Sequence, residues 1–249
     1  MTIHPSFPSS DPPSTLLSVY DGHGGAEAAA FASLNLPNYL SDALLVSGGV
    51  EGDEEGNSVL LALSASYDKT DLELSKIGNK GEKDTSLEQG TCATTVLVRG
   101  GVIYSANVGD SSAYYYETLF GKIEAKELTR NHRCSNEEEA KRIKDAGGFI
   151  FRNRVNGTLA VTRALGHREE KEFIAGTPHL SRTETKEGGW VVVASDGVWD
   201  VVGKDEVGEI VKQGKEEGVK ADEICQRIKD AALGKYGRDN IAVVVMFLK

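Results

Sequence analysis

The chain of 249 residues carries a formal net charge of −10, with 39% hydrophobic and 27% charged residues. This balance is typical of a globular protein with enough apolar residues for a sizeable core. The negative charge argues against nucleic acid as a partner, because that binding depends on Lys and Arg meeting phosphates. It would also repel a phosphorylated substrate unless bound cations reversed the sign locally.

The three cysteines, Cys92, Cys134 and Cys225, lie far apart and form no CxxC pair. They predict neither a disulfide framework nor a zinc site, so we expect reduced thiols in an intracellular protein, cytoplasmic, nuclear or both. The first residues do not resemble a signal peptide. The longest apolar run, residues 241–248, is too short to span a bilayer. The expectation is a soluble monomer without membrane contact.

One domain, residues 1–249, is expected. The Pro/Ser-rich residues 5–14 indicate extended chain, and the Gly-rich acidic residues 47–57 indicate a surface loop. Neither stretch is long enough to separate two domains.

Short segments rich in β-branched and aromatic residues predict strands. In chain order they are residues 15–20, 94–98, 102–106, 113–117, 157–162, 190–194 and 241–248. Arg99, Gly100 and Gly101 connect two of these segments and predict a hairpin turn.

Helical periodicity occurs between the predicted strands. It covers residues 24–34, 58–78, 135–148, 205–214 and 221–233. In the third of these segments, Ser135 is the predicted N-cap, Glu138 completes a capping box, and Gly147 ends the helix. Hairpins alternating with a few long helices favour an α+β layered sandwich over a parallel doubly wound sheet.

Four aspartates fall at the ends of predicted strands. Asp21, Asp110 and Asp196 follow strands, whereas Asp239 precedes one. In antiparallel pairs the exit of one strand lies beside the entrance of its neighbour, so all four carboxylates are expected at one rim. Crowded carboxylates repel one another, and such hard oxygen ligands suit Mg²⁺ or Mn²⁺. Each aspartate alone is more ordinarily a turn former or a helix cap, so the argument depends on the set.

Six segments carry a resemblance to a known family. They are VYDGHGG (19–25), GTCATT (90–95), NVGDSSA (107–113), RVNGTLAVTRALG (154–166), ASDGVWDVV (194–202) and GRDNIAVVV (237–245). In this order and spacing the chain resembles the type 2C metal-dependent Ser/Thr protein phosphatases from about residue 15 to its end. The resemblance implies a four-layer α-β-β-α sandwich of two antiparallel sheets flanked by helices, with two cations in a cleft at one rim.

The resemblance also assigns metal ligands. Asp21 would bridge two Mg²⁺ or Mn²⁺ ions, and the backbone carbonyl of Gly22 would contact one of them. Asp196 and Asp239 would hold the other ion. Asp110 and Asp200, together with Asp196, match the family's weaker third metal site.

The implied reaction is hydrolysis of phosphoserine or phosphothreonine in phosphorylated protein substrates. A water made acidic by two cations attacks phosphorus, and His23, in DGHGG, protonates the departing oxygen. Asp21 and His23 are therefore the expected catalytic residues. The alternative for His23 is a structural histidine bonded near the turn.

The sequence departs from the family in two places. Family members carry a phosphate-gripping Arg and a Met-Glu-Asp strand, whose Glu is a metal ligand, ahead of the YDGHGG strand. The opening MTIHPSF resembles the stretch after that strand, and Asp11, in a Pro-rich loop, is a poor substitute ligand. His167 stands where the family usually has Asp, and a surface position is expected for it over metal ligation or loop capping.

Two functions therefore stay open. One is a working phosphatase weakened by the missing strand, and the other is a non-catalytic phosphatase-like scaffold that binds a partner. Retention of Asp21, His23, Asp196 and Asp239 favours the first function, and loss of the Arg and Glu favours the second. Losing such charge-stabilising groups typically costs about 10²–10³-fold in rate each. We therefore expect very low activity with the fold and bound cations retained.

Overall fold

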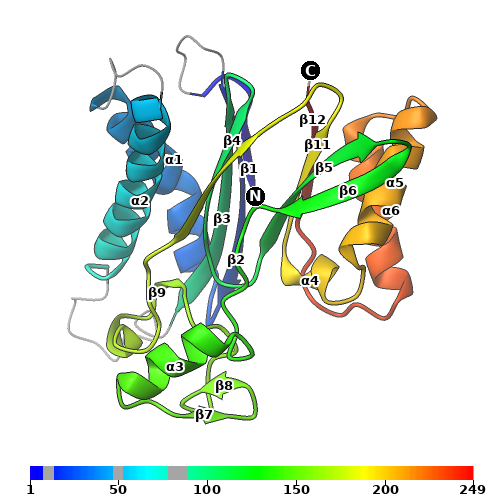
Figure 1. Ribbon diagram of the computed structural model, residues 1–249. Coiled ribbons are helices and arrows are strands. Elements are labelled where there is room, and N and C mark those ends of the chain that lie inside the picture. Colours follow the sequence, from blue (N-terminus) through cyan, green and yellow to red (C-terminus); the bar gives the residue numbers. More distant parts are fainter. Residues whose placement is uncertain (8–13, 47–52, 78–88, 249) are drawn as a thin grey trace.

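The computed structural model describes residues 1–7, 14–46, 53–77 and 89–248. Two antiparallel sheets face each other, and a pair of helices covers the outer face of each sheet (Figure 1). Helices α1 (Glu27–Val46) and α2 (Asp53–Leu74) cover the larger sheet. Helices α5 (Lys204–Glu216) and α6 (Ala221–Gly234) cover the smaller one. The predicted four-layer α-β-β-α sandwich is confirmed.

The larger sheet has the strand order β1-β2-β3-β4-β10, and β9 pairs with one end of β3. Its strands are β1 (Thr2–His4), β2 (Ser14–His23), β3 (Gly90–Arg99), β4 (Val102–Val108), β9 (Leu165–Gly166) and β10 (His179–Glu184). The smaller sheet has the order β12-β11-β5-β6. Its strands are β5 (Ser112–Leu119), β6 (Lys122–Glu127), β11 (Trp190–Ala194) and β12 (Val243–Phe247).

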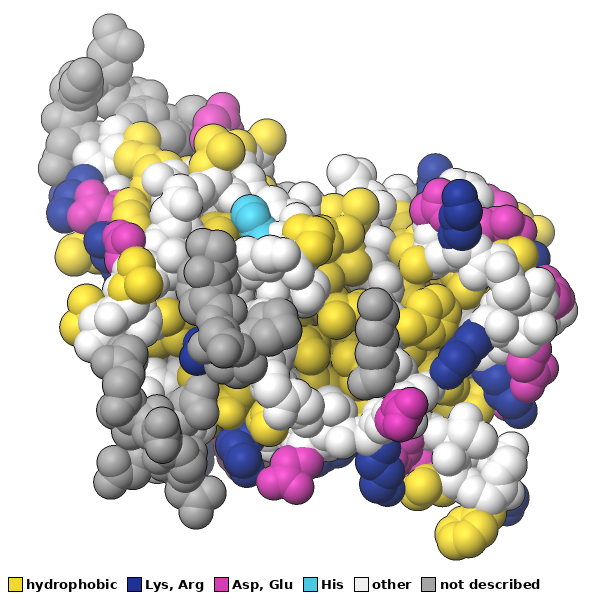
Figure 2. All heavy atoms as spheres, turned by 90° about the horizontal axis from the view of Figure 1, so that it is seen from above, with side chains coloured by type: hydrophobic (Ala, Val, Ile, Leu, Met, Phe, Trp, Pro, Cys, Tyr) yellow, Lys and Arg dark blue, Asp and Glu magenta, His cyan; other side chains and the backbone are white. Residues whose placement is uncertain are grey.

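The core lies on both faces of the central strands. Along β2, Leu16 and Tyr20 pack against the helices, whereas Leu17 and Val19 pack against the other sheet. Alternate side chains of a strand point to opposite faces, so a strand buried on both faces shows a continuous apolar run in the sequence. Seen from the end away from α3, hydrophobic side chains fill the space between the sheets (Figure 2).

Most predicted strands are confirmed with shifted ends, and the hairpin turn at Gly100 and Gly101 is confirmed by positive φ at both residues. The predicted strand at 157–162 is wrong. Asn156 and Gly157 have φ values of 49° and 77°, which break the extended chain, and the segment forms turns with isolated bridges. Its apolar Val161 packs into a small separate core with Ile143 instead. The edge strands β6 and β10 were not predicted, because their sequences are dominated by charged and polar residues.

The helices are confirmed, but their ends differ. α1 continues through Pro37 to Val46, well past the predicted end, because its apolar residues pack on the sheet. Residues 53–57, predicted as loop, open α2 instead, whereas 47–52 and 8–13, including Asp11, lie outside the described residues. Within the described part of the chain, no helix is both long and apolar enough to cross a bilayer.

Residues 131–178 form a flap segment below the sheets, built from α3 (Glu137–Asp145), β7 (Ile150–Phe151) and β8 (Arg154–Val155) (Figure 1). The N-cap of α3 is Asn136 rather than Ser135. The Asn136 side chain accepts hydrogen bonds from the backbone N–H groups of Glu138 and Glu139, which replaces the predicted capping box. The helix ends before Gly147 as predicted, where φ is 88°.

The flap segment is held together by a buried carboxylate. Glu139 is 3% exposed and accepts hydrogen bonds from Arg163 Nη2 at 2.5 Å, Arg142 Nη2 at 3.0 Å and Thr162 Oγ1 at 3.0 Å. Burial alone would raise the pKa of Glu139, but the hydrogen bonds and charges of Arg163 and Arg142 lower it to about 2. Ionised Glu139 therefore stabilises the fold.

We expect Glu139→Gln to lower the free energy of unfolding by roughly 1–3 kcal/mol near neutral pH, because hydrogen bonds to a charged group are lost. The folded pKa lies below the ordinary value of 4.5. The stabilisation is therefore present above about pH 4.5 and is lost as the pH falls towards about 2. Chemical denaturation at about pH 7 and about pH 3 measures this. The control is Glu138→Gln, whose ion pair with Arg130 is exposed. Equal losses at both pH values would contradict the expectation.

Candidate metal and phosphate site

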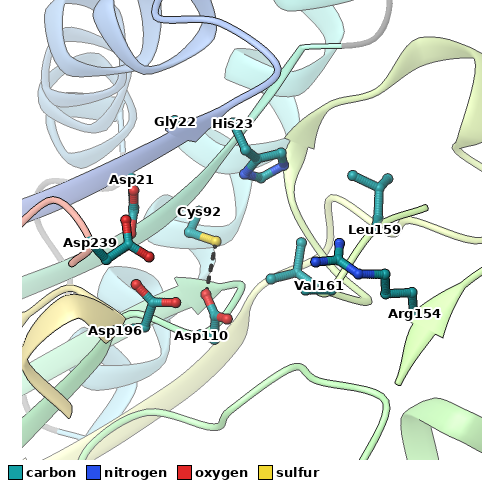
Figure 3. A pocket seen from close by; sticks show the side chains of 11 residues that line it. Asp21, Gly22, His23, Cys92, Asp110, Arg154, Leu159, Val161, Asp196 and Asp239 are labelled. Carbon is teal, nitrogen blue, oxygen red and sulfur yellow. Dashed lines mark hydrogen bonds between the residues drawn. The ribbon is translucent and has the colours of Figure 1, made fainter. Parts of the chain in front are cut away.

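The predicted site residues meet at the rim of the sheets nearest the flap segment. Asp21, Asp110, Asp196 and Asp239 all line one cavity of about 210 Å³ (Figure 3). They come from β2, the β4–β5 turn, the start of α4 (Asp196–Trp199) and the loop before β12, respectively. The expectation that four carboxylates share one rim is therefore confirmed.

The end of β2 places Asp21, Gly22 and His23 at the cavity. The strand continues through Asp21 to His23 instead of ending before Asp21, and Asp21 lies opposite Cys92 of β3. A side chain at Gly22 would approach Ala29 Cβ of α1 to 3.0 Å, so glycine allows the helix to pack close to the strand. Gly22 and His23 also line the cavity.

The cavity carries more negative than positive charge, because four aspartates and one arginine, Arg154, line it. Burial, followed by the charges of Asp196, Asp110 and Asp239, raises the pKa of Asp21 to about 7. Burial and the neighbouring carboxylates also raise the pKa of Asp196. Asp196 Oδ1 is buried and has no hydrogen-bond partner in the described part of the chain.

These donors fit a hard divalent cation, because they are carboxylate oxygens and Arg133 pairs with only two of the four aspartates, Asp110 and Asp196. Among the described residues, however, no three His, Cys, Asp or Glu side chains already form a closed cation site. Asp239 is exposed, and its Oδ1 accepts the backbone N–H of Asn240 at 2.7 Å. The aspartate carboxylates therefore lie near one another, but in the described part of the chain they do not surround a single point as the ligands of a cation would.

Arg133 offsets part of the negative charge on the other side of the cluster. Its guanidinium donates to Asp110, Asp196 and Asp200, and it lines an adjoining cavity with all three. The three carboxylates that the sequence predicts for a third ion do lie together, but they surround the guanidinium of Arg133. Sequence reasoning missed Arg133 because it belongs to none of the quoted motifs.

His23 contacts His167, and the expected surface position of His167 is wrong. His167 is 2% exposed, and its Nε2 lies 2.6 Å from Nε2 of His23, with the two ring planes inclined by 14°. One ring must donate its N–H to the lone pair of the other. Burial, then the neighbouring His23 and Lys171, lowers the pKa of His167 to about 3, so this ring is neutral.

Further lining residues come from β3 and the flap segment. The Cys92 thiol donates to Asp110 Oδ1 at 3.2 Å, and burial raises its pKa. Arg154 of β8 reaches the cavity from the opposite side (Figure 3). Both lie in segments that carried the family resemblance, but no chemical argument had assigned them a place in the site.

The chain is similar to known proteins over nearly its whole length. The family model described as Protein phosphatase 2C matches residues 2–241. The "Probable protein phosphatase 2C 32" of Oryza sativa subsp. japonica is 32% identical over 247 residues, covering 96% of this chain and 59% of the relative. The "Protein phosphatase 2C homolog 3" of Schizosaccharomyces pombe is 33% identical over 251 residues, covering 95% of this chain and 57% of the relative.

Two solved structures are also similar. One is described as a C. elegans sex determining protein, with a TM-score of 0.80, 26% identity, and 96% of this chain and 58% of that chain covered. The other is the serine-threonine phosphatase 2C of Toxoplasma gondii, with a TM-score of 0.78, 20% identity, and 97% of this chain and 87% of that chain covered. At this identity the similarity supports the fold alone.

The chain belongs to the protein phosphatase 2C family, whose members generally depend on Mg²⁺ or Mn²⁺. It spans less than two thirds of the length of the Oryza and Schizosaccharomyces relatives.

The raised pKa of Asp21 predicts a stability effect in metal-free protein. Its folded pKa of about 7 lies above the ordinary 3.8. This residue's favourable contribution is therefore complete below about pH 4 and is lost as the pH rises through about 7. With a chelator present, Asp21→Asn should stabilise the protein at about pH 8, on the order of 1 kcal/mol after allowance for solvent screening. The gain should vanish at about pH 4.

Thermal or chemical unfolding with the chelator at the two pH values measures this, and Asp42→Asn, at an exposed residue of α1, is the control. A destabilised Asp21→Asn protein at about pH 8 would show that repulsion does not dominate at this residue.

Proposed function

We propose that this chain is a metal-dependent protein Ser/Thr phosphatase that hydrolyses phosphoserine and phosphothreonine. The observation that carries the proposal is the cavity shared by four aspartates from separate elements, in which Asp196 Oδ1 is buried and has no hydrogen-bond partner among the residues that the structure describes. Membership in the protein phosphatase 2C family supports the same reaction. A scaffold that only binds a partner would not require this concentration of costly charge.

Mg²⁺ or Mn²⁺ would be held by the residues on the cavity side of the cluster. Asp21 and the backbone carbonyl of Gly22 would hold one ion, and Asp196 and Asp239, together with Asp21, would hold a second. When bound, such ions supply an acidified water and offset the charge of the substrate phosphate. The protein's own part is to hold these oxygens at one rim.

Two side chains would act on the substrate. His23, half-buried at the cavity wall, would donate a proton to the departing Ser or Thr oxygen, and its contact with His167 would fix its ring orientation. Arg154 would contact the phosphate from the flap segment, because its guanidinium faces the aspartates across the cavity (Figure 3). A cation at this point also opposes the negative field of the chain.

An intracellular setting is part of the proposal. The described cysteines are all free, and Cys92 and Cys134 are buried, as expected for thiols kept reduced. Phosphorylated proteins are the proposed substrates.

We expect Mn²⁺-dependent phosphate release from a phosphothreonine peptide by the wild-type chain, at the low rate expected from its sequence. His23→Asn should lower kcat by about 10²-fold, because a general acid is lost, and Asp21→Ala should abolish turnover. His179→Asn, a change in β10 outside the cavity, is the control. Turnover that survives Asp21→Ala would contradict the proposal. Mn²⁺ binding without any turnover in the wild type would favour the scaffold function.

We expect Asp239→Asn to reduce the rise in Tm caused by Mn²⁺ while leaving the protein folded, because one ligand charge is removed at nearly constant shape. Asp222→Asn is a matched control, since Asp222 is also exposed and also accepts the next backbone N–H, at 2.9 Å. Unchanged Mn²⁺ stabilisation in Asp239→Asn would remove Asp239 from the ligand set.

A further inference from the structure

The Arg133 side chain lies in the middle of three aspartates from different elements. Its Nε donates to Asp110 Oδ2 at 2.7 Å, and its Nη2 donates to Asp196 Oδ2 at 3.0 Å. Asp200 receives two hydrogen bonds, from Nη1 to Oδ1 at 2.8 Å and from Nη2 to Oδ2 at 2.9 Å. All three nitrogens of the guanidinium are engaged, and the pair with Asp200 has the two-pronged geometry that arginine favours.

The carboxylate oxygens are divided between Arg133 and the cavity. Asp110 uses its second oxygen to accept the Cys92 thiol, and both oxygens of Asp200 face Arg133. Asp196 turns only Oδ2 to Arg133, and its Oδ1 has no partner in the described part of the chain. Arg133 thus offsets part of the negative charge on one face of the cluster and leaves Asp196 Oδ1 on the other face without an ion-pair contact to this arginine.

The backbone around Arg133 is fixed by the surrounding elements. Arg133 forms an antiparallel bridge with Val161 of the flap segment. The preceding His132 donates its N–H to Gly109 O at 3.0 Å and accepts the N–H of Thr162 at 2.8 Å. The backbone at Arg133 is therefore held between the β4–β5 turn on one side and Val161 and Thr162, farther along the flap segment, on the other.

We propose that Arg133 is the resident cation of the Asp110–Asp196–Asp200 group and takes the place that a third divalent ion would need. An ion entering there would have to break four charge-assisted hydrogen bonds and would meet a like charge that is held close by. The proposal refines the metal positions of the proposed function. It predicts two positions that exchange metal and a third position with a fixed positive charge.

The experiment measures the number of Mn²⁺ ions bound, by calorimetric titration or by the electron paramagnetic resonance signal of free Mn²⁺. Arg133→Gln removes the guanidinium charge and should bind one more ion than the wild type. Arg130→Gln is the matched control, because Arg130 lies in the same stretch and its ion pair with Glu138 is exposed. Its ion count should equal that of the wild type. Adding Asp200→Asn to Arg133→Gln should remove the extra ion.

Asp200→Asn alone provides an arm that does not depend on the folding of Arg133→Gln, since the Asp200 side chain is 51% exposed. If Arg133 is the resident cation, this variant binds as many ions as the wild type. A lower count would show that Asp200 already holds a metal and would overturn the proposal, as would an unchanged count in folded Arg133→Gln.

The outcomes separate this proposal from the proposed function. An extra ion in Arg133→Gln with no ion in the wild type would support the role of Arg133 and contradict metal-dependent catalysis by the native chain. Ions in the wild type with none gained in Arg133→Gln would overturn the role of Arg133 alone. Absence of ions from both proteins would overturn both.

Discussion

Repulsion between carboxylates at one rim is the constraint on which the site depends. Burial, together with the nearby charges of Asp196, Asp110 and Asp239, raises the pKa of Asp21. Such a cluster persists only where counter-charge or rigid packing holds it. Arg133 supplies counter-charge on one side, and on the cavity side Asp196 Oδ1 has no hydrogen-bond partner within the described ranges of the chain. A divalent cation would therefore be favoured on the cavity side of the cluster and disfavoured on the side of Arg133.

The rigid packing comes from two sheets buried against each other and against helices. β2 is covered on both faces, which fixes its register with β3 and so fixes Asp21 opposite Cys92. β11 is likewise buried between β12 and β5, and it places Asp196 at the start of the short helix α4. Because a slip of one residue would turn each side chain to the opposite face, core packing and site geometry are set by the same contacts.

The flap segment completes the site from the opposite side. The buried Glu139 ties α3 to Arg163, and the chain then turns through β9 to bring His167 against His23. The same segment carries Arg154 to the cavity and is braced at its start next to Arg133. Arg154 and Arg133 thus both lie on the flap segment, so the docking of this segment on the sheets would govern the positions of both side chains.

The sequence by itself determined the layers and the placing of the aspartates. β11 matches its prediction because β-branched residues buried on both faces leave a clear local signal, and Asp21, Asp110, Asp196 and Asp239 follow from their places beside strands. Only the tertiary structure decided that Asn136 caps α3, that residues 157–162 form turns, and that Arg133 and His167 belong to the site. Arg133 meets Asp196 across 63 positions of chain, and His167 meets His23 across 144. Such contacts depend on how separate elements dock, and no local periodicity or motif spacing encodes that docking.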